Sequence, residues 1–330
     1  LVFLNAQENP SSEETNQGKI SGVSFFDFSY TDESGPIFDI KRSYFNYLRN
    51  LSDKISYKIT VDVGRDLSGA DTDEKLSVYL KNSEINIKIK NNGILSFGLI
   101  GMNMFNVQEK TWGYRYISKS AMDEYGFSSS ADFGLGYQHK MGKLSLNTLL
   151  TNGERYKSSG NDEFPKLSLQ FLYGNSNLKS VKVGSAFNTG LVLSVEPFES
   201  SFGPSGTVLN DEGGEYFVNP LATEIFSGTE TVIGLFGGFT TEIFMGGFEY
   251  NQYMNFDDAF TGTDGGDNQF GNDDELTPLY STYGDIKTSS LISAYFSLGL
   301  MSKFNMFFRA DMYDPNTVGD ALEDSETHIL

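Results

Sequence analysis

The chain has 330 residues, a formal net charge of -20 and no cysteine, so disulfide frameworks, thiolate catalysis and cysteine-based metal sites are excluded. With only two histidines, His139 and His328, the sequence does not support a multi-histidine metal site either. No apolar run approaches the roughly 18 residues that a membrane-spanning helix needs, which excludes helical membrane proteins. The mean hydropathy of -0.31 is still compatible with a membrane β-barrel, because barrel strands carry apolar residues only at alternate positions.

The first residues, LVFLNAQ, are mostly apolar and lead to a small residue at Ala6. This pattern is typical of the end of a secretory signal peptide whose beginning lies outside this chain, and a frayed apolar terminus is the alternative. Residues 8–17 are polar, and we expect an unstructured lead-in there. The sequence therefore divides into a lead-in over 1–17 and one strand-rich domain over 18–330.

From residue 18 onward the sequence predicts a succession of β-strands. The segment 53–64, DKISYKITVDVG, is apolar at every second position from Ile55 to Val63, with polar residues between. Such a period of two gives a strand one apolar and one polar face. In a soluble sandwich the apolar face lines a core, whereas in a transmembrane barrel it meets lipid and the polar face lines a wet lumen. The predicted strands cover about 18–31, 36–49, 53–66, 76–90, 93–101, 130–141, 143–153, 165–174, 179–195, 229–238, 240–253, 286–302 and 303–314, with another beginning near 326.

The connections between these strands alternate in length after the second strand. One set is short, and its strongest hairpin signal is Asn92-Gly93. The short set comprises 50–52, 91–93, 141–142, 174–177, a Gly237-Gly238 corner and 302–303. The other set is longer and comprises 67–75, 102–129, 154–164, 196–228, 254–285 and 315–325.

Turns on one rim and loops on the other predict an all-β, transmembrane up-and-down antiparallel β-barrel of the outer-membrane kind. Bacterial barrels have an even number of strands, and one more hairpin would bring the total to 16. We therefore expect 16 strands, with the C-terminal strands missing from this chain. A soluble β-sandwich or lectin-like fold and an array of repeats are the alternatives.

Charge is divided unevenly between loops and strands. The long loops, with their boundary residues 130 and 326 included, hold 27 acidic and 6 basic residues, whereas the strands and turns hold 14 acidic and 18 basic residues. The sequence thus predicts a mildly basic barrel wall below strongly acidic outer loops. The whole-chain charge is therefore a poor guide to the ion selectivity of a pore.

Parity along the strands, meaning the odd or even position that places a side chain on one face or the other, identifies candidate pore-lining residues. They are the charged side chains that alternate with apolar ones, although a generic solvated face would show the same pattern. The candidates are Lys58, Asp62, Glu84, Lys88, Arg309 and Asp311. Lys41 and Arg42 are adjacent, so one of them should face lipid, unless a bulge shifts the register or Arg42 lies near an interface.

The stretch GMNMFNVQEKTWGYRYISKSAMDEYGFSSSADFGLGYQHKMGKLSLNTLLTNGE, residues 101–154, resembles the phosphate-selective porin O and P group, broadly taken. Residues 38–64, FDIKRSYFNYLRNLSDKISYKITVDVG, resemble its early hairpin. The resemblance implies a 16-stranded outer-membrane porin that is often trimeric. The sequence shows no dense basic ladder of the kind on which phosphate selectivity rests in that group, so we infer no phosphate selectivity.

Residues 102–129 form the third long connection, which in general porins folds into the barrel and narrows it. The loop surrounds Trp112, Tyr114 and Tyr116 with charges of both signs, and such a loop across a lumen would create a transverse field. An exposed extracellular loop is the alternative. The candidate constriction residues are Glu109, Lys110, Arg115, Lys119, Asp123 and Glu124.

Other chemistry has weaker support. The Asp- and Gly-rich loop 255–275 could attract calcium, but its spacing does not match an EF-hand and a solvated acidic loop is the favoured interpretation. No G-x-S-x-G motif occurs, and His139 lies by a predicted turn on the rim opposite the long loops, so we do not expect an enzyme. The 17 residues before the first strand are too few for the plug domain of an energy-coupled transporter.

We therefore expect a porin in the outer membrane of a Gram-negative bacterium, through which small hydrophilic solutes or ions diffuse passively. The lumen would be narrowed by the 102–129 loop. A channel for a specific hydrophobic or oligosaccharide solute, or an adhesin-type barrel with acidic loops, is the alternative. The expected partners are outer-membrane lipid, lipopolysaccharide, the solutes and two further copies in a homotrimer, without nucleic acid, metal or cofactor.

Overall fold

We analysed a computed structural model of the chain. It describes residues 18–31, 35–65, 76–90, 92–153, 164–202, 207–209, 215–217, 224–256, 286–301, 304–315, 317 and 326–330. The lead-in over 1–17 and most of the acidic 255–275 loop lie outside the described residues. The long connections 67–75 and 154–164 lie almost wholly outside them as well.

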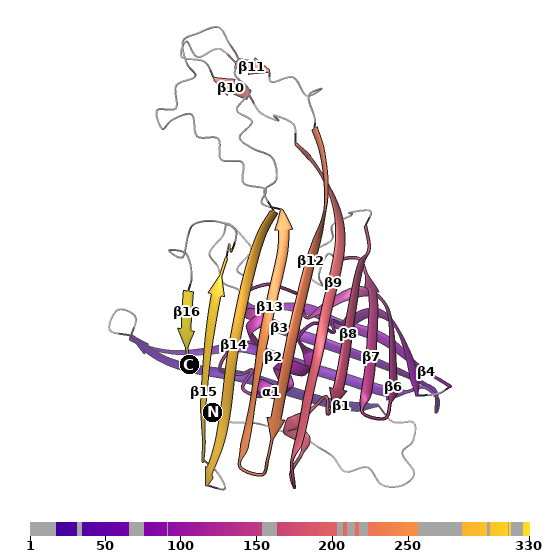
Figure 1. Ribbon diagram of the computed structural model, residues 1–330, viewed down its shortest axis with the longest axis vertical. Coiled ribbons are helices and arrows are strands. Elements are labelled where there is room, and N and C mark those ends of the chain that lie inside the picture. Colours follow the sequence, from indigo (N-terminus) through magenta and orange to yellow (C-terminus); the bar gives the residue numbers. More distant parts are fainter. Residues whose placement is uncertain are drawn as a thin grey trace.

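One antiparallel sheet of 14 strands forms the body of the molecule (Figure 1), and its strands follow one another in chain order. Only the β10–β11 pair, which joins Thr207–Leu209 to Glu215–Phe217, stands apart as a separate two-stranded sheet. The sheet strands are β1 (Lys19–Thr31), β2 (Gly35–Asn50), β3 (Ile55–Arg65), β4 (Leu76–Ile89), β5 (Gly93–Gly101), β6 (Ala131–Met141), β7 (Leu144–Thr151), β8 (Lys166–Gly174), β9 (Ala186–Phe202), β12 (Glu224–Thr240), β13 (Phe244–Phe256), β14 (Ile286–Met301), β15 (Phe304–Asp314) and β16 (Glu326–Ile329).

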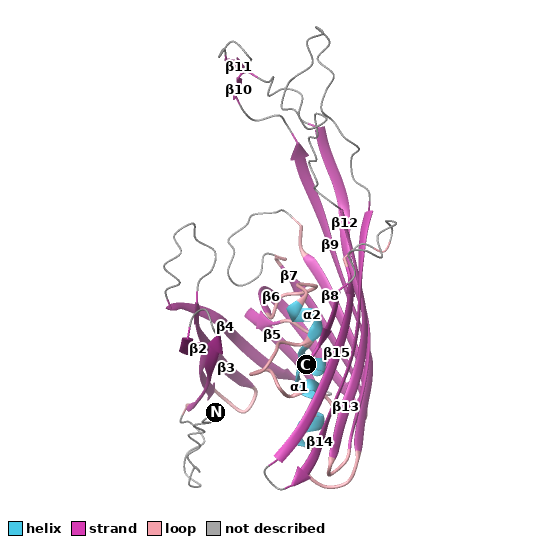
Figure 2. Cartoon of the chain, turned by 90° about the vertical axis from the view of Figure 1, so that its left-hand side faces the viewer, coloured by secondary structure: helices cyan, strands magenta, loops and turns pink. Residues whose placement is uncertain are grey.

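The sheet curls around two short helices, α1 (Asn106–Trp112) and α2 (Ala121–Glu124), so that β2 and β3 lie opposite β13 and β15 (Figure 2). The edge strands β1 and β16 are not paired with each other. The predicted all-β antiparallel barrel fold is confirmed, whereas the predicted count of 16 strands is not, because the sheet of the described residues has 14. No described helix is long and apolar enough to cross a membrane.

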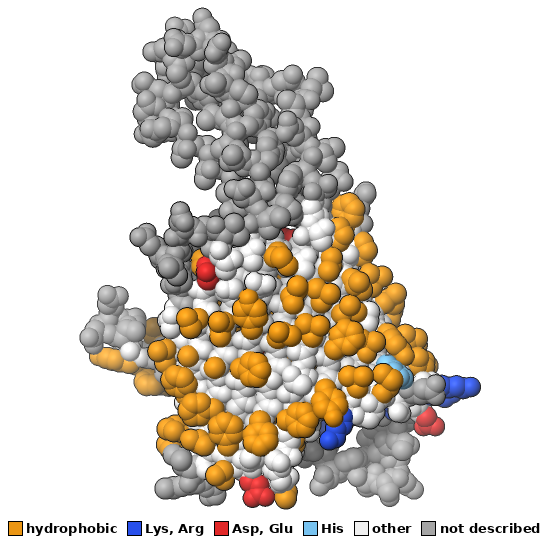
Figure 3. Space-filling view, viewed as in Figure 1, with side chains coloured by type: hydrophobic (Ala, Val, Ile, Leu, Met, Phe, Trp, Pro, Cys, Tyr) orange, Lys and Arg blue, Asp and Glu red, His pale blue; other side chains and the backbone are white. Residues whose placement is uncertain are grey.

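The two faces of the sheet differ in polarity as the alternation predicts. On β15, Phe304, Met306 and Met312 are exposed on the outer face, whereas Arg309 and Asp311 between them are buried on the inner face. Figure 3 shows apolar side chains covering the outer face of the strands on that side of the molecule. An apolar outer face and a polar inner face are what a barrel in lipid requires.

A bulge resolves the conflict between Lys41 and Arg42. The register of β1 against β2 shifts between Phe25 and Phe26, so Lys41 has no partner in the ladder. Arg42 then forms an ion pair of 2.5 Å with Asp62 on β3, and the Lys41 ammonium lies 3.5 Å from the Asp27 carboxylate. One extra residue therefore lets two adjacent basic side chains both reach carboxylates.

Two predicted boundaries are wrong for physical reasons that the structure shows. Gly237 and Gly238 do not form a corner: both remain in the β12–β13 ladder, and the chain turns at 241–243. Residues 179–185 are not a strand, because a 3-10 turn, η1 (Leu178–Ser180), precedes β9 and buries Leu178 completely. In both places the residues serve contacts with the helices inside the sheet.

Candidate functional site

The connection 102–129 folds into the concave side of the sheet rather than away from it. Its apolar side chains pack against inward-facing residues of the wall and form the main buried cluster of the molecule. Met104 and Met122 are fully buried there, and Phe127 packs near Tyr253 of β13 with ring centroids 5.8 Å apart. The loop is therefore a packed element inside the sheet, and the alternative of an exposed extracellular loop does not describe it.

Helix α1 has one buried face at helical spacing, continued from Met104 before it, on which Gln108 satisfies its amide by donating a hydrogen bond to the Met104 carbonyl. Residues 104, 107, 108, 111 and 112 are buried against the wall, a spacing of three or four residues. The helix ends at Gly113, whose φ of 75° is left-handed and is readily adopted by glycine. The Lys179 ammonium of the η1 turn donates a 2.7 Å hydrogen bond to the Gly113 carbonyl and so ties the helix end to the short-turn rim.

Glycines in the wall allow the helices to approach closely. A Cβ on Gly238 would lie 2.7 Å from Thr111 Cγ2 of α1 and 2.9 Å from Leu178 Cδ1. A Cβ on Gly234 would lie 3.2 Å from Met122 Cε of α2. A Cβ on Gly234 would also lie 2.7 Å from Val192 Cγ2 and closer still to Asn251 Oδ1, so at both positions distances under 3.0 Å would force a neighbour to shift.

Polar contacts attach the loop to the wall at its start and beyond its middle. At its start, Gln170 Nε2 of β8 donates a 2.9 Å hydrogen bond to Asn106 Oδ1, and Asn103 Nδ2 donates one of 2.9 Å to the Asn147 carbonyl. Further along, Arg309 of β15 donates to the Lys119 carbonyl, and its guanidinium lies 5.2 Å from the centre of the Trp112 ring. The loop is therefore attached to strands on both sides of its course.

Three of the predicted constriction residues form an ion-pair network on the loop. Arg115 Nε lies 3.3 Å from Glu109 Oε2, and Arg115 Nη2 lies 3.6 Å from Asp123 Oδ2. Burial raises the pKa of Glu109, and the adjacent Arg115 opposes this shift. Lys110 is exposed over part of its side chain, but desolvation by the protein around its ammonium lowers its pKa, and Glu109 opposes this shift. These residues hold charges of both signs close together on the loop.

The other loop residues are placed differently. Lys119 contributes its backbone carbonyl to Arg309, and Lys110 and Glu124 are exposed side chains. Tyr114 and Tyr116 lie next to one another, with ring centroids 6.0 Å apart, and burial raises the pKa of Tyr116. The six predicted residues therefore lie on one inward-folded loop, but only three are joined by ion pairs among the described residues.

Of the six predicted pore-lining residues, two line a cavity. Lys58 and Glu84 lie 3.5 Å apart and border a space of about 200 Å³ that also contacts Asn86, Gln138 and Asn147. Lys88 is exposed close to the short-turn rim.

The remaining three face inward but are covered by protein. Asp62 is 0% exposed beneath Arg42, and Arg309 and Asp311 are 1% and 3% exposed beneath the loop. Parity identified their face correctly and did not identify the loop that covers them. They therefore contact protein and do not line open water.

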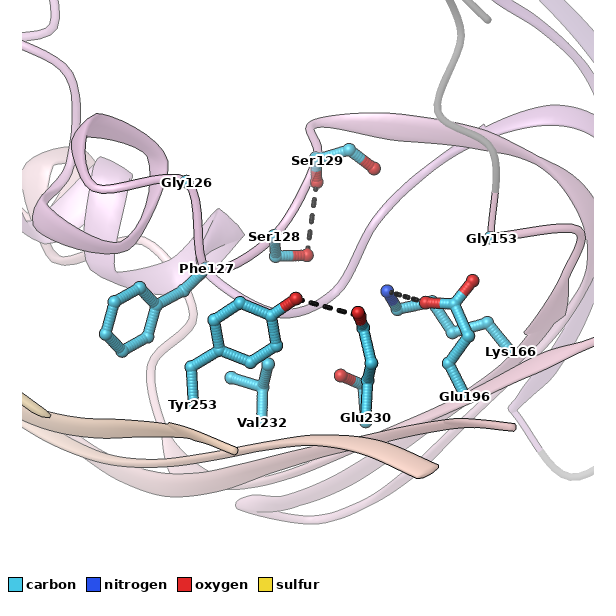
Figure 4. Close-up of a pocket in the computed structure, with 11 residues that line it drawn as sticks. Gly126, Phe127, Ser128, Ser129, Gly153, Lys166, Glu196, Glu230, Val232 and Tyr253 are labelled. Carbon is cyan, nitrogen blue, oxygen red and sulfur yellow. Dashed lines mark hydrogen bonds and ion pairs between the residues drawn. The ribbon is translucent and has the colours of Figure 1, made fainter. Parts of the chain in front are cut away.

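A second cavity, of about 170 Å³, separates the loop from the wall near the long-loop rim (Figure 4). Ser128 and Ser129 of the loop border one side, and Lys166 and Tyr253 of the wall point in from the other. Glu196 and Glu230 are directly opposite each other on β9 and β12. The Lys166 ammonium lies 2.6 Å from Glu196 Oε2, and the Tyr253 hydroxyl donates a 2.8 Å hydrogen bond to Glu230 Oε2.

The sequence interpretation missed the buried polar residues beneath the loop. Glu249 and Ser293 are 1% and 0% exposed, and Ser293 Oγ donates a 2.6 Å hydrogen bond to Asp311 Oδ1. Asn251 Nδ2 donates a 3.1 Å hydrogen bond to Glu249 Oε2. Their inward parity was the available signal, since Glu249 alternates with Phe248 and Tyr250 on β13.

Comparison with known proteins supports the fold. No protein-family model matches the chain, and no curated protein matches it. Among solved structures, OmpT in trimer form, an outer membrane protein of Vibrio cholerae, is similar with a TM-score of 0.51 at 12% identity, over 94% of this chain and 81% of that chain. Outer-membrane-expressed OmpT of Vibrio cholerae gives a TM-score of 0.51 at 13% identity, over 94% and 80%.

These likenesses show that the chain has the fold of an outer-membrane β-barrel protein. At 12% and 13% identity they say nothing about the solute. The resemblance to the phosphate-selective porin O and P group is not confirmed, because no family model matches. The finer assignment of family and solute therefore stays a prediction.

Proposed function

We propose that the chain is an outer-membrane porin through which small hydrophilic solutes or ions diffuse passively. The inward-folded 102–129 connection is the observation that carries this proposal. It occupies the concave side of a sheet whose outer face is apolar, and it presents the Glu109–Arg115–Asp123 ion pairs there. A mixed-charge loop in that place narrows a passage and selects by size and charge without any chemical step.

The outer face supports a location in the outer membrane. Large apolar side chains such as Phe248, Leu235 and Ile292 are 58%, 50% and 50% exposed on neighbouring strands, which costs little in lipid and much in water. Lipid and lipopolysaccharide are the partners that this face fits. The trimer form of the Vibrio cholerae neighbour supports a homotrimer as part of the proposal.

An enzyme is not part of the proposal. A hydrolase would need a nucleophile with an adjacent base. His139 has the same parity as the outer-face residues Phe133 and Leu135 of β6, and its ring stacks with Tyr137 at 6.1 Å between centroids. His328 of β16 pairs with Asp311 of β15, and its ring centroid lies 6.0 Å from that of Tyr125. Neither position resembles a serine–histidine pair that opens to the long-loop rim.

The test is planar-bilayer recording on the purified full chain under a salt gradient. We expect discrete conductance steps, and the sign of the reversal potential will show which ion the pore prefers. A protein that is folded by heat-modifiable gel mobility yet gives no steps in repeated insertions would overturn the proposal. An adhesin-type barrel would then account better for the acidic loops.

A further inference from the structure

A row of aromatic rings crosses the concave side of the sheet from one wall to the other. It begins at Phe307 of β15, whose ring centroid lies 4.9 Å from that of Tyr114. Tyr114 lies 6.0 Å from Tyr116, and Tyr116 lies 6.5 Å from Phe25 of β1. Phe25 in turn lies 6.1 Å from Tyr44 of β2. The row therefore runs from β15 through the loop to β1 and β2.

These rings differ from the core rings of the same loop. Trp112 and Phe127 are 2% and 3% exposed and are packed against the wall. Tyr114 and Tyr116 are only partly buried, as are Phe25 and Tyr44 on the opposite strands. A row that served packing alone would be covered like the core rings. Part of the surface of these rings therefore stays open, although the Lys81 ammonium lies 4.6 Å from the centre of the Tyr44 ring.

The charges beside the row are largely balanced in pairs. Arg42 is paired with Asp62 at 2.5 Å, and Arg115 contacts both Glu109 and Asp123. Each guanidinium therefore already has a carboxylate partner, and an anionic solute would have to compete with that partner. The same groups still offer N–H donors and carboxylate acceptors to a neutral solute that can use both.

We propose that this row, Phe307–Tyr114–Tyr116–Phe25–Tyr44, is a binding track for neutral carbohydrate, an inference that rests on the proposed pore function. A sugar ring carries C–H groups on its faces, which suit the negative face of an aromatic ring, and hydroxyl groups on its edge. The tyrosine hydroxyls and the ion pairs beside the row supply the complementary donors and acceptors. Consecutive rings 4.9 to 6.5 Å apart allow an oligosaccharide to contact more than one ring at once.

Two other solute classes fit the row less well. A hydrophobic solute would gain from the ring faces but would strip water from the charged groups Arg115 and Glu109 beside them. Inorganic phosphate would need cations without carboxylate partners, which the pairs at Arg42 and Arg115 do not provide. Both classes are outcomes of the test below.

The test is single-channel recording of the full chain in planar bilayers with neutral glucose oligomers of one to five units. We expect brief current blocks, with a dissociation constant that falls as the oligomer lengthens, because a longer chain contacts more rings. Tyr116→Ser should weaken binding roughly threefold to tenfold, as expected for the loss of one aromatic contact, whereas Tyr116→Phe should retain most of it. Tyr173→Ser, on the exposed outer face of β8, is the matched control and should leave binding unchanged.

The outcomes separate this inference from the proposed function. A folded chain without conductance steps overturns the pore itself. Conductance steps that no oligomer blocks, while inorganic phosphate or a hydrophobic solute does block them, overturn the carbohydrate track alone. If Tyr116→Ser fails to fold, the oligomer-length series on the unaltered chain and the Tyr114→Ser variant decide the question by the same criterion.

Discussion

Replacement of Arg309 by methionine should release the loop from β15. The guanidinium donates two hydrogen bonds to Asp311, at 2.9 Å and 2.5 Å, and a third to the Lys119 carbonyl. It is 1% exposed, so its loss leaves the Asp311 carboxylate buried with only Ser293 as a described hydrogen-bond donor. Removal of one partner of a buried ion pair costs about 3–5 kcal/mol, and we expect destabilisation of that size.

Trp112 gives this experiment a local reporter, because it is the single tryptophan of the chain and lies 5.2 Å from the Arg309 guanidinium. In Arg309→Met its emission should shift to the red as the ring, now 2% exposed, meets water. Urea unfolding in detergent micelles measures the accompanying loss in free energy of unfolding. Arg49→Met, at an exposed position of β2, is the matched control and should change neither quantity.

The double variant Arg309→Met/Asp311→Leu tests the reasoning more strictly. When both charges are replaced by apolar side chains, neither member of the pair stays buried without its partner, so most of the stability lost with the pair should return. The Lys119 carbonyl still lacks its donor, so the tryptophan shift should persist in part. A double variant as unstable as the single one, or a single variant destabilised by less than about 1 kcal/mol with unchanged emission, would refute this account.

Further predictions concern the wall, the lipid face and pH. Gly238→Val should push α1 from the wall, because a Cβ there lies 2.7 Å from Thr111. The overpacking should cost about 1–3 kcal/mol of stability and change the single-channel conductance. Unchanged conductance would contradict this prediction. Ile59→Lys, on the lipid side of β3, should cost about 2–4 kcal/mol of stability and impair assembly. Asn86→Lys, beside the inner cavity, should mainly alter conductance. Equal assembly yields of the two variants would count against the assignment of Ile59 to the lipid face and Asn86 to the inner face. Burial raises the pKa of Glu109 above its ordinary value of 4.5, so on acidification this carboxylate should lose its charge at a higher pH than usual. The preference of the pore for cations should fall in that pH interval. The free energy of unfolding should decrease as the pH rises through the same interval, because the folded state holds this proton more tightly than the unfolded state. Reversal potentials against pH measure the preference, and Glu109→Gln should abolish this dependence.

Most of the fold is predictable from the sequence because strand alternation and connection length are local signals. The alternation in residues 304–312 specifies which side chains of β15 face lipid, and the structure follows it. The Gly237-Gly238 pair shows where local signals fail. Glycine marks a turn in most sequences, but here it serves the approach of Thr111 from a segment more than 120 residues away. No local pattern contains that contact.

The site is predictable only in part, for the same reason. The 102–129 connection and its charged residues could be selected by position, but the helical spacing at residues 104, 107, 108, 111 and 112 was overlooked in a chain of strands. Which inward residues meet water depends on where the loop lies. Lys58 borders a cavity, whereas Arg309, which also faces the inner side of the sheet, is covered by the loop. Parity gives the face of a residue, and packing decides its exposure.

The distribution of basic residues changes what the wall can do. By count the wall is mildly basic, which alone suggests that it attracts anions. Inside the sheet, however, four described basic side chains are matched by carboxylates at short range: Arg42–Asp62, Lys58–Glu84, Lys166–Glu196 and Arg309–Asp311. Exposed lysines stand instead at the short-turn rim, at 54, 90, 140 and 182. Because a paired charge exerts little field beyond its partner, these four pairs give the inner surface hydrogen-bonding groups rather than net charge, and the exposed lysines place positive charge at one rim of the barrel. Such pairing is what the proposed carbohydrate track requires, because hydroxyl groups can use both the donors and the acceptors of an ion pair.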